Sequence, residues 1–385
     1  MMSIVLYLGM ALFCALWGTD QHPAAAPGQP KDSLYYTMED FLQVEKTDAH
    51  VHINTSRPDF MEQAARDHFR AMTVNYDDPS DSSDTREQEA FALDQIRTFP
   101  GRVGYACSFS TRNFNDPGWV PETINSLSNS FSRGAAAVKI YKVIGMSLRD
   151  GSGRLVMIDD PRLAPVLDFI AARHMPVLGH LGEPRNCWLP AEEMTIAGDR
   201  NYFTQHPEYH MYLHPEFPGY QAQIASRDHM LEMHPNLRFV GAHLGSLEWN
   251  VDELARRLDR FPNMAVDLAA RITHLQYQAV RNRSRVRDFM IRYQDRLIYA
   301  TDMGAGPLSG GLALGRDLHA TWLSDWKFFV TQDNMQVPDV DSAFSGLHLP
   351  RSVIDKIYRL NARAWYPRLF REAPEPRRGG GASRP

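Results

Sequence analysis

Two histidines at alternate positions of one segment are the first residues in this chain that could do chemistry. His50 and His52 lie in the stretch TDAHVHI, residues 47–53, whose composition predicts a β-strand. Side chains two residues apart on a strand point to the same side, so both imidazoles would share one face. Neutral imidazoles bind Zn²⁺ and related cations, and the pair therefore indicates a metal site, with chance spacing as the alternative.

Four more residues with suitable side chains stand at the ends of other strand-like runs. Lys139 lies in AAAVKIYK, His180 follows VLG, His243 lies in FVGAHLG, and Asp302 closes YATD. Each of them alone is more often a packed or capping residue than a ligand. A barrel of parallel strands, however, brings the carboxyl ends of all its strands together. We therefore expect these four side chains to meet the two histidines of the first run.

Eight strand-like runs would position these residues. The runs cover residues 47–53, 69–75, 102–109, 135–142, 175–181, 237–244, 263–270 and 296–302. Helical spacing of apolar residues recurs between them, as in residues 163–170 and 251–261. Such alternation predicts an α/β fold with parallel strands, and eight units predict a (β/α)₈ TIM barrel. A doubly wound sheet is the alternative, but no Gly-rich nucleotide loop follows the first run.

A long insertion is expected after the fifth strand, in residues 182–217, which are rich in Pro, His, Tyr and acidic residues. Loops of this length in a compact domain are usually functional. Within it, Glu183 is a candidate for substrate contact, with a surface acid as the alternative, and Trp188 could form an apolar wall. Arg271, at the end of the seventh run, could clamp a substrate carboxylate or pair with Asp267.

The two ends of the chain differ in composition from the rest. Residues 1–19 carry no Lys, Arg, Asp or Glu, and their apolar run is shorter than the about 20 residues of a membrane-spanning helix. We interpret residues 1–31 as a signal peptide with a linker, which predicts export to the periplasm or the cell exterior. An N-terminal membrane tether is the alternative. The barrel domain is expected over residues 32–372, and the Pro/Gly-rich residues 373–385 are expected to form a disordered tail.

The composition restricts the partners of the mature chain. Its 385 residues, 43% of them hydrophobic, suffice for a large buried core. The net charge of −5 argues against a nucleic-acid partner, which usually requires a basic face. We expect a small-molecule substrate and no stable membrane span after the leader. The sequence leaves open whether the chain forms a homo-oligomer.

The order of these residues resembles that of the amidohydrolase superfamily of metal-dependent barrel enzymes, and within it the amidohydrolase-2 branch. The resemblance extends from DAHVHI through VLGHLGEP, FVGAHLG and YATD to IYRLNARAWYP. It implies a divalent metal held by His50, His52, His180 and Asp302. It also implies that His243 polarises water or substrate, or joins a second metal. The branch includes lactonases, other hydrolases and nonoxidative decarboxylases.

The chemistry of such a site follows from its donor set. Imidazoles and a carboxylate suit Zn²⁺, with Mn²⁺ and Fe²⁺ as alternatives, as one or two ions. A bound metal lowers the pKa of its water from about 15.7 to about 7, Asp302 would act as general base, and the metal or His243 would stabilise an oxyanion. We expect hydrolysis of a small-molecule ester, lactone or amide-like bond. Nonoxidative decarboxylation at the same site and a noncatalytic metal-binding barrel are the alternatives.

Lys139 is the least certain member of this set. By resemblance, it occupies the strand that in binuclear members holds a carboxylated lysine bridging two metals. Burial beside cations favours a neutral amine, which could react with carbon dioxide to give such a carbamate. The alternative is an ammonium that faces a substrate carboxylate. Lys142 is a competing candidate, but a regular strand would place it on the opposite face.

Overall fold

The computed structural model describes residues 34–79 and 84–370. The predicted leader at residues 1–31 and the predicted tail at residues 373–385 therefore lie outside the described residues, and so does the question of export. Among the described residues, no helix combines the length and the apolar character that a membrane span needs.

Eight predicted strands are present, and they form one parallel sheet. Nine segments are hydrogen-bonded in the order β8-β7-β6-β5-β4-β3-β2-β1-β9. Their bounds are β1 Lys46–Ile53, β2 Phe69–Val74, β3 Val103–Ser108, β4 Ala137–Ile140, β5 Val177–Gly179, β6 Phe239–Gly241, β7 Met264–Asp267, β8 Leu297–Ile298 and β9 Gly304–Ala305. A separate antiparallel pair consists of β10 Asn334–Met335 and β11 Phe344–Ser345.

The eighth strand of the barrel is interrupted, and its two pieces close the sheet on itself. β8 pairs with β7, whereas β9 pairs with β1. Between them, the backbone N–H of Ala49 donates to Tyr299 O (3.1 Å) and that of Asp302 donates to His50 O (2.8 Å). The predicted TIM barrel is therefore confirmed.

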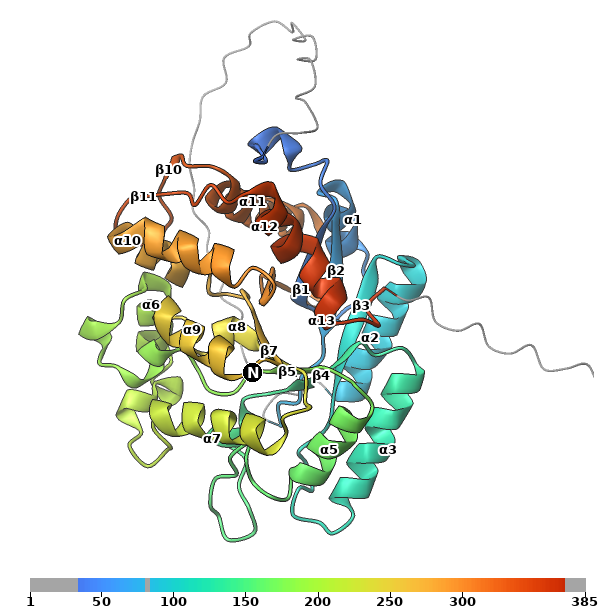
Figure 1. Cartoon of the computed structure of the whole chain (residues 1–385). Coiled ribbons are helices and arrows are strands. Elements are labelled where there is room, and N and C mark those ends of the chain that lie inside the picture. Colours follow the sequence, from blue (N-terminus) through green and yellow to red (C-terminus); the bar gives the residue numbers. More distant parts are fainter. Residues whose placement is uncertain (1–33, 80–83, 371–385) are drawn as a thin grey trace, which may run out of the picture. The chain divides into compact units, whose positions relative to one another are not determined.

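Helices connect successive strands and surround them (Figure 1). The α-helices are α1 Asp59–Arg66, α2 Thr85–Thr98, α3 Trp119–Ser132, α4 Val143–Met146, α5 Ala164–Ala172, α6 Ala197–Gln205, α7 Tyr220–Met233, α8 Ala242–Gly245, α9 Val251–Arg260, α10 Ile272–Arg292, α11 Gly311–Val330, α12 Arg351–Asp355 and α13 Asn361–Trp365. The 3₁₀ segments are η1 Met38–Asp40, η2 Arg185–Trp188, η3 Ala191–Glu193, η4 Pro207–Tyr209 and η5 Met211–Leu213, and η6 Lys356–Leu360 is a π-helix.

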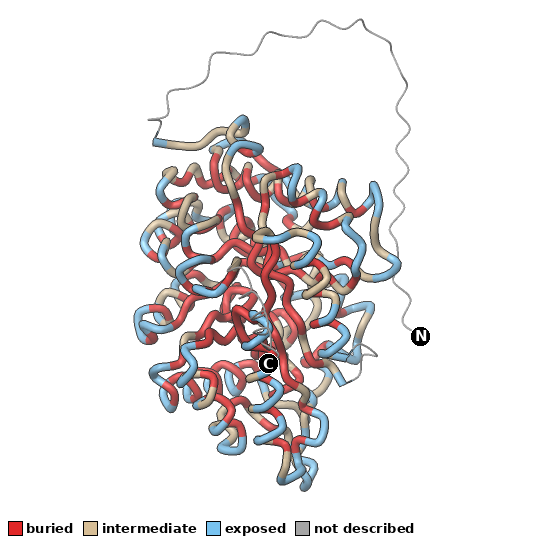
Figure 2. Tube along the Cα trace, turned by 90° about the vertical axis from the view of Figure 1, so that its right-hand side faces the viewer, coloured by how far each residue is buried: buried red, intermediate tan, exposed pale blue. Residues whose placement is uncertain are grey.

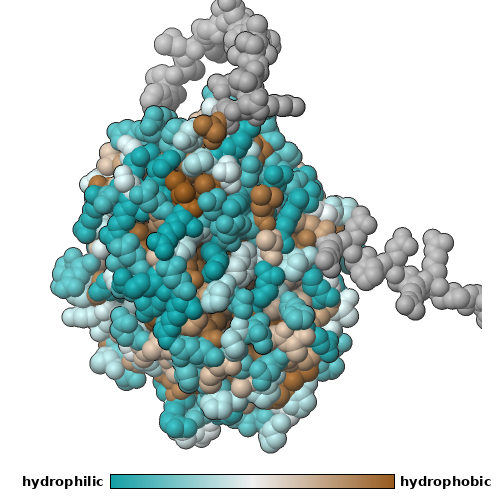
Figure 3. All heavy atoms as spheres, in the orientation of Figure 1, coloured by the Kyte–Doolittle hydropathy of each residue, from teal (hydrophilic) through white to brown (hydrophobic). Residues whose placement is uncertain are grey.

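Helix α9 illustrates why the predicted helices form. Its residues Val251, Leu254 and Leu258 recur at helical spacing and are buried, while its charged residues face outward. The side chain of Asn250 caps its first turn by accepting from Asp252 N at 2.9 Å. The strands lie buried at the centre of the barrel, with exposed residues on the outer turns (Figure 2). The face drawn in Figure 3 is mostly hydrophilic, with scattered hydrophobic patches.

The inner face of the barrel is filled by an apolar cluster, to which each of β1 to β8 contributes. Its strand residues are Ala49, Met72, Val74, Ala106, Ala137, Leu178, Val240, Ala265 and Ile298. Many of them are alanines because a closed eight-stranded barrel leaves room for few large side chains. We call this group the inner cluster.

A β-bulge in β1 decides which residues of that strand point inward. The register between β1 and β2 shifts between Asp48 and Val51. Ala49 belongs to the inner cluster, whereas Val51 packs outside it with the helices. In a regular strand these two residues would share one face, so the bulge reverses the alternation and turns His50 and His52 inward.

The predicted insertion after the fifth strand is also present. It leaves β5 and contains η2, η3, α6, η4 and η5 before α7 begins at Tyr220. Cys187, Met194, Phe203 and Met211 form its own small buried cluster. Because it packs around its own core, the insertion can present α6 as a fixed wall to the mouth of the barrel.

Candidate active site

A cavity of about 470 Å³ lies at the carboxyl ends of the strands. Its wall includes every residue that we predicted as a metal ligand, namely His50, His52, Lys139, His180, His243 and Asp302. The volume falls within the range of about 300–1,000 Å³ that is typical of small-molecule sites. The barrel thus brings residues that are far apart in the sequence into one cavity.

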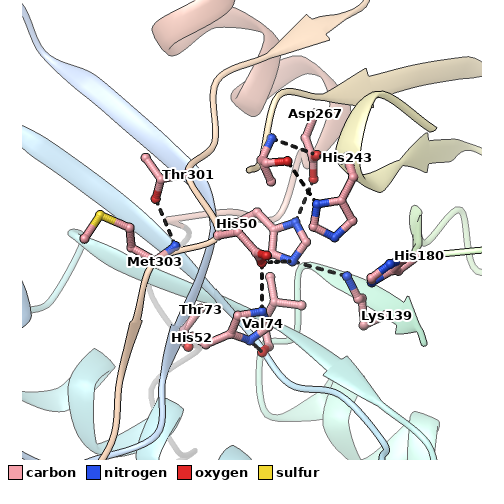
Figure 4. A network of polar contacts seen from close by, with 12 residues as sticks. His50, His52, Thr73, Val74, Lys139, His180, His243, Asp267, Thr301 and Met303 are labelled. Atoms are coloured by element: carbon pink, nitrogen blue, oxygen red, sulfur yellow. Dashed lines mark hydrogen bonds and ion pairs between the residues drawn. The ribbon is translucent and has the colours of Figure 1, made fainter. Parts of the chain in front are cut away.

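His50 is oriented by a carboxylate behind it. Its Nδ1 lies 2.8 Å from Asp267 Oδ2, and both side chains are fully buried (Figure 4). A carboxylate accepts the Nδ1 proton, so Nε2 keeps its lone pair. That Nε2 lies 3.3 Å from Asp302 Oδ1 and 3.2 Å from Lys139 Nζ. The contact from Asp267 therefore aims a basic nitrogen at the cavity, as outer-sphere partners of metal ligands do.

His52 and His243 are held in the same tautomer by backbone carbonyls. Nδ1 of His52 donates to Val74 O at 2.7 Å, and Nδ1 of His243 donates to Ala269 O at 3.0 Å. A carbonyl can only accept, so in each neutral ring Nε2 is free of a proton. Nε2 of His52 lies 3.1 Å from Asp302 Oδ1. Three imidazoles thus use Nδ1 for support and keep Nε2 for a ligand.

His180 supplies a nitrogen that lacks a partner. Its ring centroid lies 4.3 Å from that of His243, and its buried Nε2 has no hydrogen-bond partner. Glu183 Oε2 is 3.8 Å away, beyond hydrogen-bond distance. A buried polar atom without a partner costs about 1–3 kcal/mol, unless a ligand satisfies it.

The donor atoms lie close enough to share a cation. Ligand atoms of His50, His243 and Asp302 all lie within 4.8 Å of one another. His52 reaches the same Asp302 oxygen, and the unpartnered His180 adjoins His243. These residues fit a divalent metal, because imidazole nitrogens and a carboxylate oxygen converge on one place. Among the described residues, no single cationic side chain contacts all of these atoms.

Burial sets the protonation states of the site. It lowers the pKa of His50 and His243 well below the ordinary value, and that of His180 to about 3. Burial by itself disfavours the Asp302 carboxylate, but the adjoining imidazoles, His243 first among them, outweigh it and hold its pKa well below its usual range. Neutral imidazoles and an ionised carboxylate are the forms that bind a metal.

Lys139 reaches the same centre, and Lys142 corrects one expectation. Lys139 is 1% exposed, and burial lowers its pKa to about 8. Its carboxylation stays a prediction. Lys142 was expected on the opposite face from Lys139, but it lines the same cavity and its Nζ pairs with Glu183. The expectation is wrong because β4 ends at Ile140, so strand alternation no longer applies at Lys142.

Left-handed backbone occurs at two site residues and at the residue that precedes Arg271. Asp302, His243 and Ala270 have φ of 68°, 60° and 54°, the left-handed region that most residues avoid. The turn around His243 also requires glycine, because a Cβ on Gly241 would lie 2.8 Å from Gly245 Cα. Such strain costs about 1–3 kcal/mol per residue and persists mainly at functional sites. It turns the His243 ring into the cavity, although His243 lies three positions after the inward-facing Val240 and simple alternation would place it outside.

Two of the predicted substrate contacts line the cavity. Glu183 is not a surface acid, since its side chain is 12% exposed and pairs with Lys142. Arg271 does not pair with Asp267, because the Asp267 oxygens accept from His50 and from the backbone N–H groups of His243 (2.7 Å) and Ala269 (3.2 Å). Its guanidinium instead donates to Ala270 O at 3.0 Å.

The third predicted contact, Trp188, lies elsewhere. Its indole N–H donates to Pro218 O at 3.3 Å and its ring packs against Tyr220, so it braces the insertion and does not line the cavity. The physical reason is that η2 turns the indole toward α7. Aromatic residues that we did not predict take this place in the cavity wall, namely Tyr76, Tyr141, Tyr202 and Phe203.

Asp267 is the most important residue that the sequence analysis missed in this role. It was considered only as a partner of Arg271. Strand alternation does indicate that Asp267 points inward, because it follows the inward-facing Ala265 by two residues. Lys139 follows Ala137, and His180 follows Leu178, in the same way.

Comparison with known proteins shows the family to which this chain belongs. A model of the amidohydrolase-2 family, described as amidohydrolase, matches residues 44–368. No curated protein matches the sequence at a significant level.

Solved structures of similar architecture include three barrel proteins. An uncharacterized TIM-barrel protein from Bordetella bronchiseptica is 14% identical, with 84% of this chain and 99% of that chain covered and a TM-score of 0.48. A 2,6-dihydroxybenzoate decarboxylase from Rhizobium is 13% identical, with 84% and 98% covered and a TM-score of 0.47. A 4-oxalomesaconate hydratase from Rhodopseudomonas palustris is 14% identical, with 80% and 79% covered and a TM-score of 0.42. Because the family model spans residues 44–368 of the 385, the protein belongs to the amidohydrolase family, which typically binds a divalent metal.

Proposed function

We propose that this amidohydrolase is a metal-dependent hydrolase that cleaves an ester, lactone or amide-like bond of a small molecule. One observation carries the proposal. His50, His52 and His243 each bind a fixed acceptor through Nδ1 and turn Nε2 toward the Asp302 carboxylate. This arrangement suits a Lewis-acid metal and a water molecule, because ring nitrogens and a carboxylate oxygen, all of which can donate an electron pair to a cation, converge in one cavity.

His50, His52, His180 and Asp302 would hold the metal, for which Zn²⁺ is the first candidate. When bound, a divalent metal lowers the pKa of a water molecule from about 15.7 to about 7 and polarises a carbonyl oxygen. Lys139 would bridge a second ion if it is carboxylated, and otherwise remains a buried amine beside His50.

Asp302 is the proposed general base. Its side chain is 30% exposed, so substrate and water can reach it from the cavity. Its carboxylate is ionised and can accept the proton that a water molecule loses as it attacks a carbonyl carbon. Nε2 of His50 and Nε2 of His52 lie 3.3 and 3.1 Å from Oδ1, so a metal that these residues hold in common would also fix the carboxylate.

His243 takes a narrower role than the sequence suggested. Its Nδ1 donates to Ala269 O and burial keeps the ring neutral, so Nε2 is an acceptor. The ring can therefore bind a metal or receive a proton. It can donate to an oxyanion or a leaving group only after it has received that proton.

Nonoxidative decarboxylation at the same site is the second candidate. The cavity holds the cationic side chains Lys139 and Arg271, which could draw in a substrate carboxylate. In that case the product would include carbon dioxide in place of a new acid group.

One experiment tests the metal and separates the two reactions. Purified full-length protein should contain about one or two equivalents of divalent metal and lose activity on chelation. Esters, lactones, amides and aromatic carboxylates should be assayed for acid release and for carbon dioxide release. Metal-free protein with full activity would refute both reactions.

A matched pair of variants locates the metal. His50→Ala should lose bound metal, because an inner ligand is removed. His229→Ala is the control, since His229 is 55% exposed and pairs with Asp159 outside the cavity. Equal metal content in the two variants would contradict the assignment.

A further inference from the structure

The outer wall of the cavity carries two opposite charges that the proposed chemistry does not use. Asp199 comes from α6 of the insertion, and Arg271 follows β7. Both line the same cavity as the metal-site residues. Among the described residues, no ion pair within 4.0 Å joins Arg271 to any carboxylate.

Asp199 is held in place from behind. Asn186 Nδ2 donates to Asp199 Oδ2 at 2.8 Å, and His274 Nε2 lies 3.2 Å from the same oxygen. In the part of the chain that the structure describes, no side chain or N–H donates to Asp199 Oδ1. Burial opposes ionisation of Asp199, but His274, Arg271 and Asn186 outweigh it and lower its pKa. Asp199 is therefore a fixed, ionised acceptor whose Oδ1 is available to a ligand.

Arg271 is also fixed in place, and it is the cation that remains available. Its backbone follows the strained Ala270, and one guanidinium N–H is bound to Ala270 O at 3.0 Å. The other two cations of the cavity are already engaged, because Lys142 pairs with Glu183 and Lys139 lies against His50. A guanidinium whose remaining donors are unused is suited to a planar carboxylate.

Aromatic rings line the space near these charges. The rings of Tyr76 and Tyr141 lie 5.1 Å apart between centroids, and Tyr202 and Phe203 project from the same helix as Asp199. Such surfaces favour a flat, partly apolar ligand.

We infer that the substrate is a small planar molecule that carries both a carboxylate, bound by Arg271, and a hydrogen-bond donor, bound by Asp199. The pairing explains why the insertion brings an acid into the same cavity as an arginine although no ion pair within 4.0 Å joins the two described residues. The inference rests on the proposed function for the reaction, but the two charges can be tested without turnover.

Three probes of nearly equal size separate the two contacts. The first is 3-hydroxybenzoate, which has both the carboxylate and the donor. The second is benzoate, which lacks the hydroxyl donor, and the third is 3-hydroxybenzamide, which lacks the negative charge. Their binding should be measured by isothermal titration calorimetry on full-length protein, both metal-loaded and metal-free. In both forms, 3-hydroxybenzoate should bind at least about tenfold more tightly than either of the others, because each lost contact is a charge-assisted hydrogen bond.

Variants assign each preference to a residue. Arg271→Gln should weaken 3-hydroxybenzoate about tenfold and leave 3-hydroxybenzamide within about twofold. Asp199→Asn should lower the discrimination between 3-hydroxybenzoate and benzoate at least about threefold. Arg281→Gln is the control, because Arg281 lies on α10 outside this cavity and is bound to Tyr277 Oη.

The outcomes separate the inference from the proposed function. Equal binding of the three probes, binding of none of them, or equal effects of Arg271→Gln and Arg281→Gln would overturn the substrate inference. Metal content and ester hydrolysis are measured on the same preparations. If they persist while the probe preferences are absent, the proposed function stands and the substrate class is wrong.

Discussion

The inner cluster and the rim of the barrel, where the carboxyl ends of the strands carry the site residues, differ in backbone geometry. The inner cluster consists of apolar residues, one or more from each of β1 to β8, that follow regular strand alternation. At the rim, His50 and His52 depend on a bulge, His243 depends on left-handed backbone, and Asp302 also has left-handed backbone. Regular geometry therefore provides stability, while irregular geometry presents the reactive side chains, and that presentation costs about 1–3 kcal/mol at each strained residue.

The largest effect on catalysis is expected when a charge at the rim is removed. Asp302→Asn removes the proposed base, and we expect kcat to fall by about 10²–10⁴-fold. Folding stability should also fall, because the site holds the pKa of the Asp302 carboxyl well below its usual range and Asn lacks that charge, but the left-handed backbone of residue 302 is tolerated by Asn. Steady-state kinetics and thermal unfolding of the same sample provide both values. Retained catalysis would contradict the role, and a noncatalytic metal-binding barrel would keep its binding function in this variant.

A cavity created in the inner cluster should lower folding stability without removing any reactive side chain. Leu178 is fully buried in β5, and Leu178→Ala should lower the free energy of unfolding by about 2–5 kcal/mol. Denaturant titration measures this change, with Leu42→Ala as control because Leu42 is 58% exposed. If both substitutions cost the same, the inner cluster does not carry the stability assigned to it.

Asp267 connects the two regions, and its substitution should affect the metal. In Asp267→Asn an amide N–H would face His50 Nδ1, which reverses the tautomer and places the proton on Nε2. We expect metal affinity to fall about 10–100-fold. Asp168→Asn is a matched control, since Asp168 also contacts a histidine, His234, but is 70% exposed and does not line the cavity. Competition with a chelator measures the affinity, and equal values would refute the supporting role.

The smallest effect concerns strain itself. Ala270→Gly should raise the free energy of unfolding by up to about 1 kcal/mol, because glycine adopts the φ of 54° without a clash. The same substitution inside helix α9, Ala255→Gly, should lower it by about 0.5–1 kcal/mol. Denaturant titrations of the pair check the opposite signs. A loss of stability in Ala270→Gly would show that this backbone is not strained.

Most of the fold and part of the site follow from patterns that are local in sequence. The eight runs of β-branched and apolar residues predict the eight strands, and parallel strands with connecting helices close into a barrel. Lys139 and His180 follow regular alternation from inner-cluster residues, so their inward direction is readable from the sequence.

The remaining features depend on contacts between distant segments. The bulge in β1, the paired charges of Lys142 and Glu183, and the place of Trp188 away from the cavity are set by neighbouring strands and helices. The support of His50 by Asp267 joins residues 217 positions apart in the sequence.

The sequence by itself determined which side chains could do chemistry and that they stand at strand ends, because residue type and periodicity are local properties. Only the tertiary structure decided the tautomers, the unpartnered nitrogen of His180 and the separation of Asp199 from Arg271. These features depend on burial and on distances of a few ångströms between segments, which no local pattern encodes.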